Sequence, residues 1–189
     1  MDELAVAAGR DPVEMRLDLM TDAPSRTVLE AVADMAGWGA PPASGRARGV
    51  AFALAFGVPT AQIVEIEETG GGIIVRDVWV AADVGVALDP RNLDAQLISG
   101  VNYGLSAAIG EEITLTSGAV DQSNFHDYPV LRIYQAPRIH TRVLENQRHI
   151  RGIGEPGTPA TAPALANAIF ALTGQRLRNL PLGKSVDFA

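Results

Sequence analysis

Apolar side chains recur at helical spacing through the first forty residues. Asp11 precedes Pro12 and Glu14, which is typical of a helix start, because Asp11 can accept backbone N–H groups and proline fits the first turn. Gly37 follows a later apolar series, as expected for a residue that ends a helix in the left-handed conformation. The pattern predicts helices over 2–8, 11–20 and 28–36, with a break at 23–25.

Between residues 49 and 144 the apolar pattern changes to a period of two, which is typical of half-buried strands. Residues 69–72 (Thr-Gly-Gly-Gly) separate two such stretches and predict a hairpin turn, and the Gly- and Pro-rich stretch 38–48 predicts a linker. The predicted strands cover 50–56, 62–67, 73–80, 112–115, 120–122 and 138–144, and two further helices cover 93–109 and 161–173.

These elements predict an α+β fold, in which N-terminal helices precede mixed β-hairpins that pack against the helices near 93–109 and 161–173. We expect two parts: an N-terminal helical segment over 1–40 and the rest of the domain over 41–189. A helix through 62–80 would contradict this layout.

Composition and charge exclude several classes of protein. Hydrophobic residues make up 47% of the 189 positions, which is typical of a folded chain. The chain has 15 Lys and Arg against 22 Asp and Glu, a net charge of −7, with no basic cluster, so no nucleic-acid partner is expected. It has no cysteine, so it cannot itself hold a disulfide, a thiolate zinc site or an iron–sulfur cluster.

The sequence shows no recognisable targeting signal or membrane-spanning segment. No apolar run reaches the roughly 20 residues that a membrane-spanning helix needs. The first residues are acidic, whereas a signal peptide begins with basic residues. A cytoplasmic or a periplasmic place as part of a complex therefore remains open.

The predicted helix 93–109 carries Gln96, Gly100, Gly104 and Ala108 at intervals of four, so these residues share one face. Each glycine inside a helix costs about 1 kcal/mol relative to alanine. Close approach of another backbone or of a ligand would offset this cost. Tight packing is the commoner use of small residues, and spacing alone favours it.

Residues 152–159 (GIGEPGTP) form a loop of small residues around one carboxylate, Glu155. Gly152, Gly154 and Gly157 match the GxGxxG pattern of dinucleotide sites, but Pro156 removes a backbone donor and no acidic residue follows about 20 positions later. A nicotinamide-binding domain is therefore not favoured. Glu155 is a candidate general base if it is sheltered, and an ordinary loop glutamate if it is exposed.

Adjacent His126 and Asp127 invite a metal or acid–base interpretation. The other histidines, His140 and His149, are nine residues apart and show no ligand spacing. We therefore expect His126 and Asp127 to be structural or to line a pocket, and no metal-ligating residue is predicted.

The chain resembles the C-terminal end of the molybdenum-binding subunit of the xanthine dehydrogenase and aldehyde oxidase family, nearest to the isoquinoline 1-oxidoreductase beta-subunit type. The most specific stretch is GIGEPGTPATAPALANAIFALTGQRLRNLPL at 152–182. The others are DELAVAAGRDPVEMRLDLM at 2–20, GRARGVAF at 45–52, DVGVALDPRNLDAQLISG at 83–100, YGLSAAIGEEITL at 103–115 and QSNFHDYPVLRI at 122–133. The resemblance therefore covers nearly the whole chain.

This resemblance implies roles for residues already described. Glu155 falls on the family's Gly-Glu-Pro motif and would be the general base of a hydroxylation that uses oxygen from water. Gln96 would contact a molybdopterin cofactor, in bacteria usually molybdopterin cytosine dinucleotide, and Gly100, Gly152 and Gly154 would complete this chain's cofactor contacts. Electrons would leave through a partner subunit that carries [2Fe–2S] clusters.

Family members are several times longer, so this chain would hold only part of the site. The expected partners are the rest of the molybdenum subunit, the [2Fe–2S] subunit and a small N-heterocyclic or aldehyde substrate. An exposed apolar surface and association into oligomers are also expected. The alternative is a folded module without cofactor, with a role in assembly or interaction.

Overall fold

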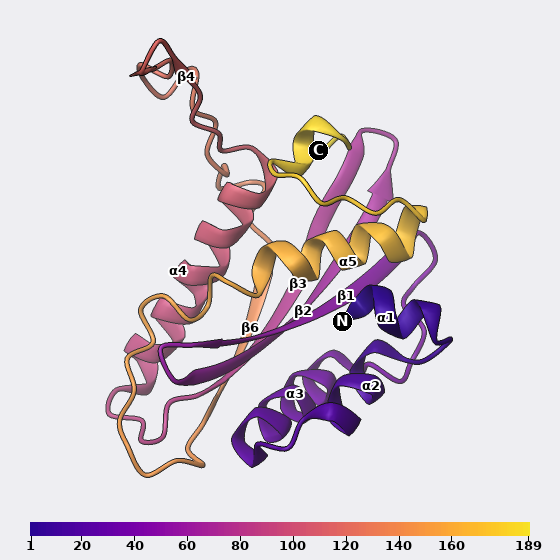
Figure 1. The fold of residues 1–189 in the computed structure, drawn as a ribbon, viewed down its shortest axis with the longest axis vertical. Coiled ribbons are helices and arrows are strands. Elements are labelled where there is room, and N and C mark those ends of the chain that lie inside the picture. The colour runs from indigo at the N-terminus through magenta and orange to yellow at the C-terminus, as the bar shows by residue number, and fades with distance from the viewer.

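A four-stranded sheet forms the middle layer of the computed structural model, which describes residues 1–189 (Figure 1). Its strands, in spatial order, are β1 (Arg46–Ala55), β2 (Val58–Thr69), β3 (Gly72–Asp83) and β6 (Arg138–Leu144). β1, β2 and β3 pair antiparallel, whereas β6 pairs parallel to β3. The four predicted strands of this region are confirmed, and the first three are longer than predicted.

One face of the sheet is covered by the N-terminal helices α2 (Pro12–Leu19) and α3 (Ala23–Ala36), which follow the short α1 (Asp2–Ala7). Asp11 caps α2 as predicted and accepts the N–H of Val13 at 2.8 Å. Val28 and Leu29 of α3 pack against Ile63 of β2. The N-terminal segment therefore shares a hydrophobic core with the sheet.

The predicted break at 23–25 is wrong, because these residues form the first turn of α3. The carboxylate of Asp22 caps this turn and accepts the N–H of Ser25 at 3.0 Å. Pro24 is tolerated because first-turn residues make no intrahelical N–H bond that proline could remove. The predicted linker over 38–48 also ends early, since β1 begins at Arg46.

The opposite face is covered by α4 (Pro90–Ile109) and α5 (Thr161–Thr173), which confirm the two helices predicted there. Leu97 and Leu105 of α4 and Leu165 of α5 share a core with Val64 of β2. Gly49 of β1 lets α5 approach the sheet, because a Cβ there would overlap backbone atoms of the helix. The result is an α/β/α arrangement of three layers.

Residues 110–137 form an arm that leaves the end of α4 and projects from the sheet (Figure 1). A small hairpin at its tip pairs β4 (Leu115–Thr116) with β5 (Ala119–Val120), so the predicted hairpin is confirmed, but its strands are shorter than the predicted 112–115 and 120–122. The arm carries exposed large apolar side chains, among them Phe125, Ile133 and Tyr134. After α5, a short 3₁₀ helix η1 (Leu182–Lys184) brings Leu182 into the core.

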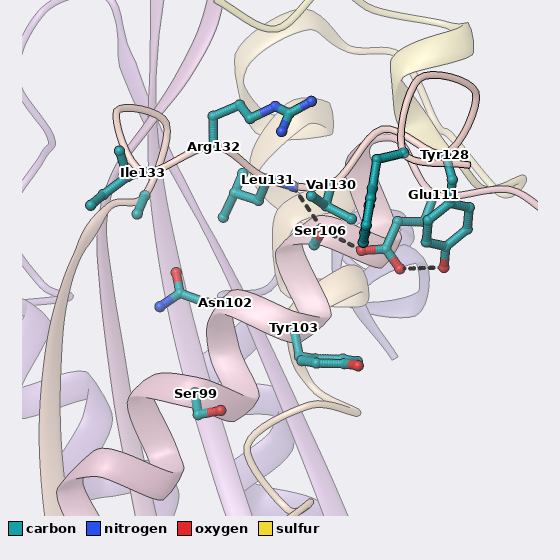
Figure 2. A pocket seen from close by; sticks show the side chains of 12 residues that line it. Ser99, Asn102, Tyr103, Ser106, Glu111, Tyr128, Val130, Leu131, Arg132 and Ile133 are labelled. Carbon is teal, nitrogen blue, oxygen red and sulfur yellow. Dashed lines mark hydrogen bonds between the residues drawn. The ribbon is translucent and has the colours of Figure 1, made fainter.

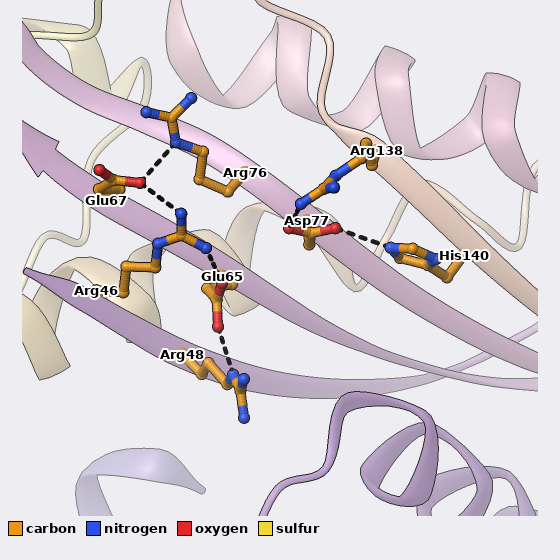
Figure 3. Close-up of polar contacts among 8 residues, drawn as sticks. All are labelled: Arg46, Arg48, Glu65, Glu67, Arg76, Asp77, Arg138 and His140. Carbon is orange, nitrogen blue, oxygen red and sulfur yellow. Dashed lines mark hydrogen bonds and ion pairs between the residues drawn. The ribbon is translucent and has the colours of Figure 1, made fainter. Parts of the chain in front are cut away.

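Ion pairs stand on the sheet around Glu65 of β2 and Asp77 of β3, which lie opposite each other in the strand pairing (Figure 3). Two buried carboxylates each have two partners: Arg46 (3.0 Å) and Arg48 (2.7 Å) for Glu65, and Arg138 (2.8 Å) and the imidazole of His140 (2.8 Å) for Asp77. Burial disfavours the charged form of Asp77, but the hydrogen bonds from His140 and Arg138 outweigh burial and lower its pKa. These buried carboxylates are satisfied within the fold and need no ligand.

Candidate functional site

A hollow of about 340 Å³ lies where α4 begins and the 150–154 segment crosses it. Gln96, Gly152 and Gly154, three of the predicted site residues, line this hollow. A Cβ on Gly154 would lie 4.0 Å from the Oε1 atom of Gln96. The fold thus brings together residues that are more than fifty positions apart in the chain.

Gly100 lies beneath this loop, not on the surface of the hollow. It is buried, and a Cβ there would come within 3.1 Å of the Cα of Gly157. One turn later, a Cβ on Gly104 would come within 2.7 Å of the side chain of Thr161. The glycines on this face of α4 therefore serve close packing against the loop that follows Glu155. A contact between Gly100 and a cofactor stays a prediction.

Gln62 of β2 is a positioning residue that the sequence analysis missed. Its side chain is fully buried, its Nε2 donates to the carbonyl oxygen of Gly157, and its Oε1 accepts from the Thr161 hydroxyl at 2.9 Å. The Thr158 hydroxyl adds a bond to the carbonyl oxygen of Gly100 at 3.1 Å. A glutamine inside an apolar strand was the available signal, because a buried amide needs partners.

Glu155 lies beside the hollow at an exposed turn, and its carbonyl oxygen accepts the N–H of Thr158 at 2.9 Å. Its carboxylate makes no ion pair or hydrogen bond within this chain. One backbone hydrogen bond therefore fixes the turn that begins at Glu155, and the carboxylate has no partner within the chain. Glu155 is exposed, so within this chain it matches the second alternative, an ordinary loop glutamate, and its role as a general base stays a prediction for the complete site.

The donors around the hollow fit a cofactor that carries oxyanion and polar edges. Arg151 is one of the residues that line the hollow, and its Nε is buried without a hydrogen-bond partner. The side-chain amide of Gln96 makes no bond within the chain either. The half-buried guanidinium of Arg151 has no partner to offset its partial desolvation, and the half-buried amide of Gln96 is free to donate, so both favour a ligand that accepts hydrogen bonds.

The segment that includes His126 and Asp127 lies on the arm. Asp127 accepts the N–H groups of Ser123 (2.8 Å) and Asn124 (3.0 Å), and these bonds lower its pKa to about 2. Its carboxylate therefore fastens a turn, which is a structural role. His126 is exposed, with Nε2 3.6 Å from Asp127. No group of three His, Cys, Asp or Glu side chains is arranged to hold a metal ion.

A second hollow, of about 670 Å³, separates α4 from the arm, and Phe125 and Tyr128 line it (Figure 2). The Tyr128 hydroxyl donates to Glu111 at 2.9 Å, which raises the pKa of Tyr128, and Glu111 also accepts from the Ser106 hydroxyl. Ser106 in turn accepts the N–H of Leu131 at 2.8 Å. This chain of bonds fastens the base of the arm to α4. None of the predicted site residues lies here.

The three-layer fold and its donor-lined hollow define a ligand-binding domain. Residues 9–137 match the family model of the molybdopterin cofactor-binding domain, and the chain belongs to that family. The match includes Gln96 and Gly100 and ends before the Glu155 loop. No helix is long and apolar enough to cross a membrane.

Named relatives extend the similarity beyond the family model. The chain is 35% identical to the beta subunit of isoquinoline 1-oxidoreductase from Brevundimonas diminuta, over 96% of this chain and 24% of that protein. It is 31% identical to a nicotinate dehydrogenase subunit of Pseudomonas putida, over 96% of this chain and 17% of that protein. The chain thus spans about a quarter or less of these relatives.

A solved structure shares the fold. Quinoline 2-oxidoreductase from Pseudomonas putida 86 superposes with a TM-score of 0.57 over 66% of this chain and 17% of its own, at 22% sequence identity. The predicted α+β architecture of a molybdenum cofactor-binding domain is therefore confirmed.

Proposed function

We propose that this chain is the C-terminal part of the molybdenum-binding subunit of a hydroxylase. The complete enzyme would hydroxylate an N-heterocyclic or aldehyde substrate with oxygen from water and pass electrons to a [2Fe–2S] subunit. Family membership and the names of the relatives support the reaction class. The observation that carries the proposal is the free carboxylate of Glu155 beside a hollow lined by Gln96, Gly152 and Gly154.

The residues of the hollow would hold one portion of a molybdopterin cytosine dinucleotide. The Gln96 amide can donate to and accept from the pterin, and Gly152 and Gly154 leave room for the cofactor to approach the backbone. Gly100 supports this surface from below by allowing Gly157 to pack on α4. When bound, the cofactor would supply the two-electron redox chemistry. The rest of the subunit would supply the remaining contacts.

Glu155 would act as the general base. The adjoining turn holds its backbone, while its carboxylate is not engaged by any other group of the chain. A neighbouring chain segment that covered this loop would remove water and raise the proton affinity of the carboxylate.

A second candidate is a module without cofactor whose role is assembly. The exposed apolar side chains of the arm favour this interpretation, since such surfaces commonly mark interaction sites. The two candidates differ in one measurable respect, the molybdenum content of the complex that contains this chain.

The test is Glu155→Gln in the assembled enzyme, with Glu68→Gln as the control because Glu68 is also exposed and makes no ion pair. The amide keeps the shape of the acid but cannot accept the proton. We expect turnover per molybdenum to fall about 10²–10⁴-fold, with KM nearly unchanged. The control should stay within about twofold of wild type.

Equal turnover of the Glu155→Gln and wild-type enzymes would remove Glu155 from the mechanism. A complex that contains no molybdenum would instead favour the assembly role. Unfolding curves of both variants check that the substitution leaves the fold intact.

A further inference from the structure

We propose that the hollow at the start of α4 binds a small oxyanion group, phosphoryl or carboxylate, through Arg151 and the backbone N–H groups that follow it. This inference rests on the proposed function only for the identity of the molecule that carries the oxyanion. A phosphoryl group would belong to the cofactor, and a carboxylate would belong to a substrate acid. Phosphoryl and carboxylate groups both present negatively charged oxygen atoms to the same donors.

The first observation concerns arginines that make no side-chain hydrogen bond or ion pair. Four arginines belong to this set, and Arg91, Arg132 and Arg148 are exposed, so water can solvate them. Arg151 is partly buried, and its Nε is out of contact with solvent. Because arginine stays protonated in proteins, this side chain cannot relieve the cost by losing its charge. The Nη1 and Nη2 atoms of Arg151 make no hydrogen bond within the chain and are not sealed from solvent, so an anion in the hollow would pair with these two atoms.

The turn between β1 and β2 accounts for the partial burial of Arg151. Phe56 and Gly57 both have positive φ, at 54° and 78°. A Cβ on Gly57 would lie 3.4 Å from the Cζ of Arg151. The N–H of Arg151 also donates to the carbonyl oxygen of Val84 at 2.9 Å. The guanidinium therefore lies against fixed backbone and is not free to move into solvent without losing these contacts.

The second observation concerns the backbone after Arg151. The N–H groups of Gly152, Ile153, Gly154 and Glu155 donate no hydrogen bond within the chain. Successive free N–H groups are the means by which glycine-rich loops bind anions, since each contributes a fixed partial positive charge. Gly152, Ile153 and Gly154 are lining residues next to Arg151, so their free N–H groups add donors to those of the guanidinium.

The acceptors on the lining are few. Asp89 is the one carboxylate among the lining residues, and it caps α4 by accepting the N–H of Asn92 at 3.3 Å. The side-chain amides of Asn92 and Gln96 make no bond within the chain and can donate to a ligand. The set therefore offers donors from a guanidinium, two amides and the loop backbone. An oxyanion of small size matches this set.

The experiment titrates the full 189-residue chain, without molybdenum, with inorganic phosphate in one arm and benzoate in the other, at constant ionic strength. Backbone amide signals are followed by ¹⁵N NMR. We expect saturable shifts at Gly152, Ile153 and Gly154 with at least one probe. Tighter binding of phosphate assigns the site to the cofactor, and tighter binding of benzoate assigns it to a substrate acid.

Arg151→Gln should weaken binding at least about tenfold, because charge-assisted hydrogen bonds are the strong ones. Arg151→Lys, which keeps the charge but loses the planar fork, should give an intermediate affinity. Arg148→Gln is the matched control, since it removes an exposed, unpaired arginine three positions away, and should change affinity less than about twofold. Amide dispersion of each variant reports whether it is folded.

The proposal is overturned if neither probe gives saturable shifts at 152–154, or if Arg148→Gln weakens binding as much as Arg151→Gln. Neither result would contradict the proposed role of Glu155, because the titration measures anion binding and involves no turnover and no metal. Conversely, loss of the Glu155 mechanism would leave the oxyanion titration unchanged. The two hypotheses can therefore fail separately.

Discussion

Replacing Gln62 with methionine should destabilise the fold by about 2 kcal/mol. Methionine has a similar length and no branching, so it fills the site without overpacking. It removes the bond to the Gly157 carbonyl oxygen and the bond from the Thr161 hydroxyl. Each buried hydrogen bond contributes about 0.5–1.5 kcal/mol, so the two together contribute about 1–3 kcal/mol.

The position of the Thr161 hydroxyl narrows the expected loss in the free energy of unfolding. The Thr161 hydroxyl also lies 3.1 Å from the Gly157 carbonyl oxygen and can donate to it after the substitution. Neither partner of Gln62 is then left wholly unpaired in the core, which avoids the larger penalty for an orphaned buried group. We therefore expect Gln62→Met to lower the free energy of unfolding by about 2 kcal/mol, near the middle of the range for two hydrogen bonds.

The assay is urea unfolding of wild type, Gln62→Met, Thr161→Val and the double variant, analysed at constant m-value. Because Gln62 and Thr161 share a bond, the double variant should lose less than the sum of the single losses. Gln175→Met, at an exposed position, should change the free energy of unfolding by less than about 0.5 kcal/mol. A loss below about 0.5 kcal/mol for Gln62→Met, or strict additivity in the double variant, would refute this account of how the Glu155 loop is held.

Two further outcomes follow from the structure. Gly49→Ala should destabilise the chain by about 3 kcal/mol or more, because its Cβ would overlap the Ala164 carbonyl oxygen and the Ala168 nitrogen. Gly70→Ala is the control, since a Cβ at Gly70 would meet nothing within 4 Å. Equal melting temperatures for the two variants would contradict this prediction. Asp127 has its pKa lowered to about 2 in the fold, so its stabilising effect should be complete above about pH 4 and lost as pH falls toward 2. The difference in melting temperature between wild type and Asp127→Asn should therefore shrink over that interval, and a constant difference from about pH 6 to pH 2 would count against it.

The secondary structure could be predicted where local chemistry decides it. Asp11 caps its helix, and Gly37 and Gly174 end theirs at φ of 57° and 75° in the left-handed region. Strand positions followed from the period of two. The wrong prediction of a break at 23–25 has a local cause too, since proline breaks a helix in its interior but Pro24 lies in the first turn of α3.

Tertiary relations were harder to derive. The pattern of β6 indicates a strand but not its parallel pairing with β3, because direction depends on the intervening path through α4 and the arm. The spacing of Gly100 and Gly104 correctly predicts that they share one face of α4. Only the structure shows that Gly157 and Thr161 pack against this face. The sequence does not single out Arg151, because whether a guanidinium is paired depends on neighbours that only the fold brings together.

The bond between Gln62 and Gly157 also bears on how the chain folds. The strands β1, β2 and β3 are joined by short turns and can pair early, whereas this contact closes 95 residues and the neighbouring contact to Thr161 closes 99. Long closures carry a larger entropic cost and form late. During synthesis, β2 and α4 both emerge before the Glu155 loop. The loop is therefore laid onto a surface that already exists, and a chain that stopped before Gly157 would leave the Gln62 amide without partners.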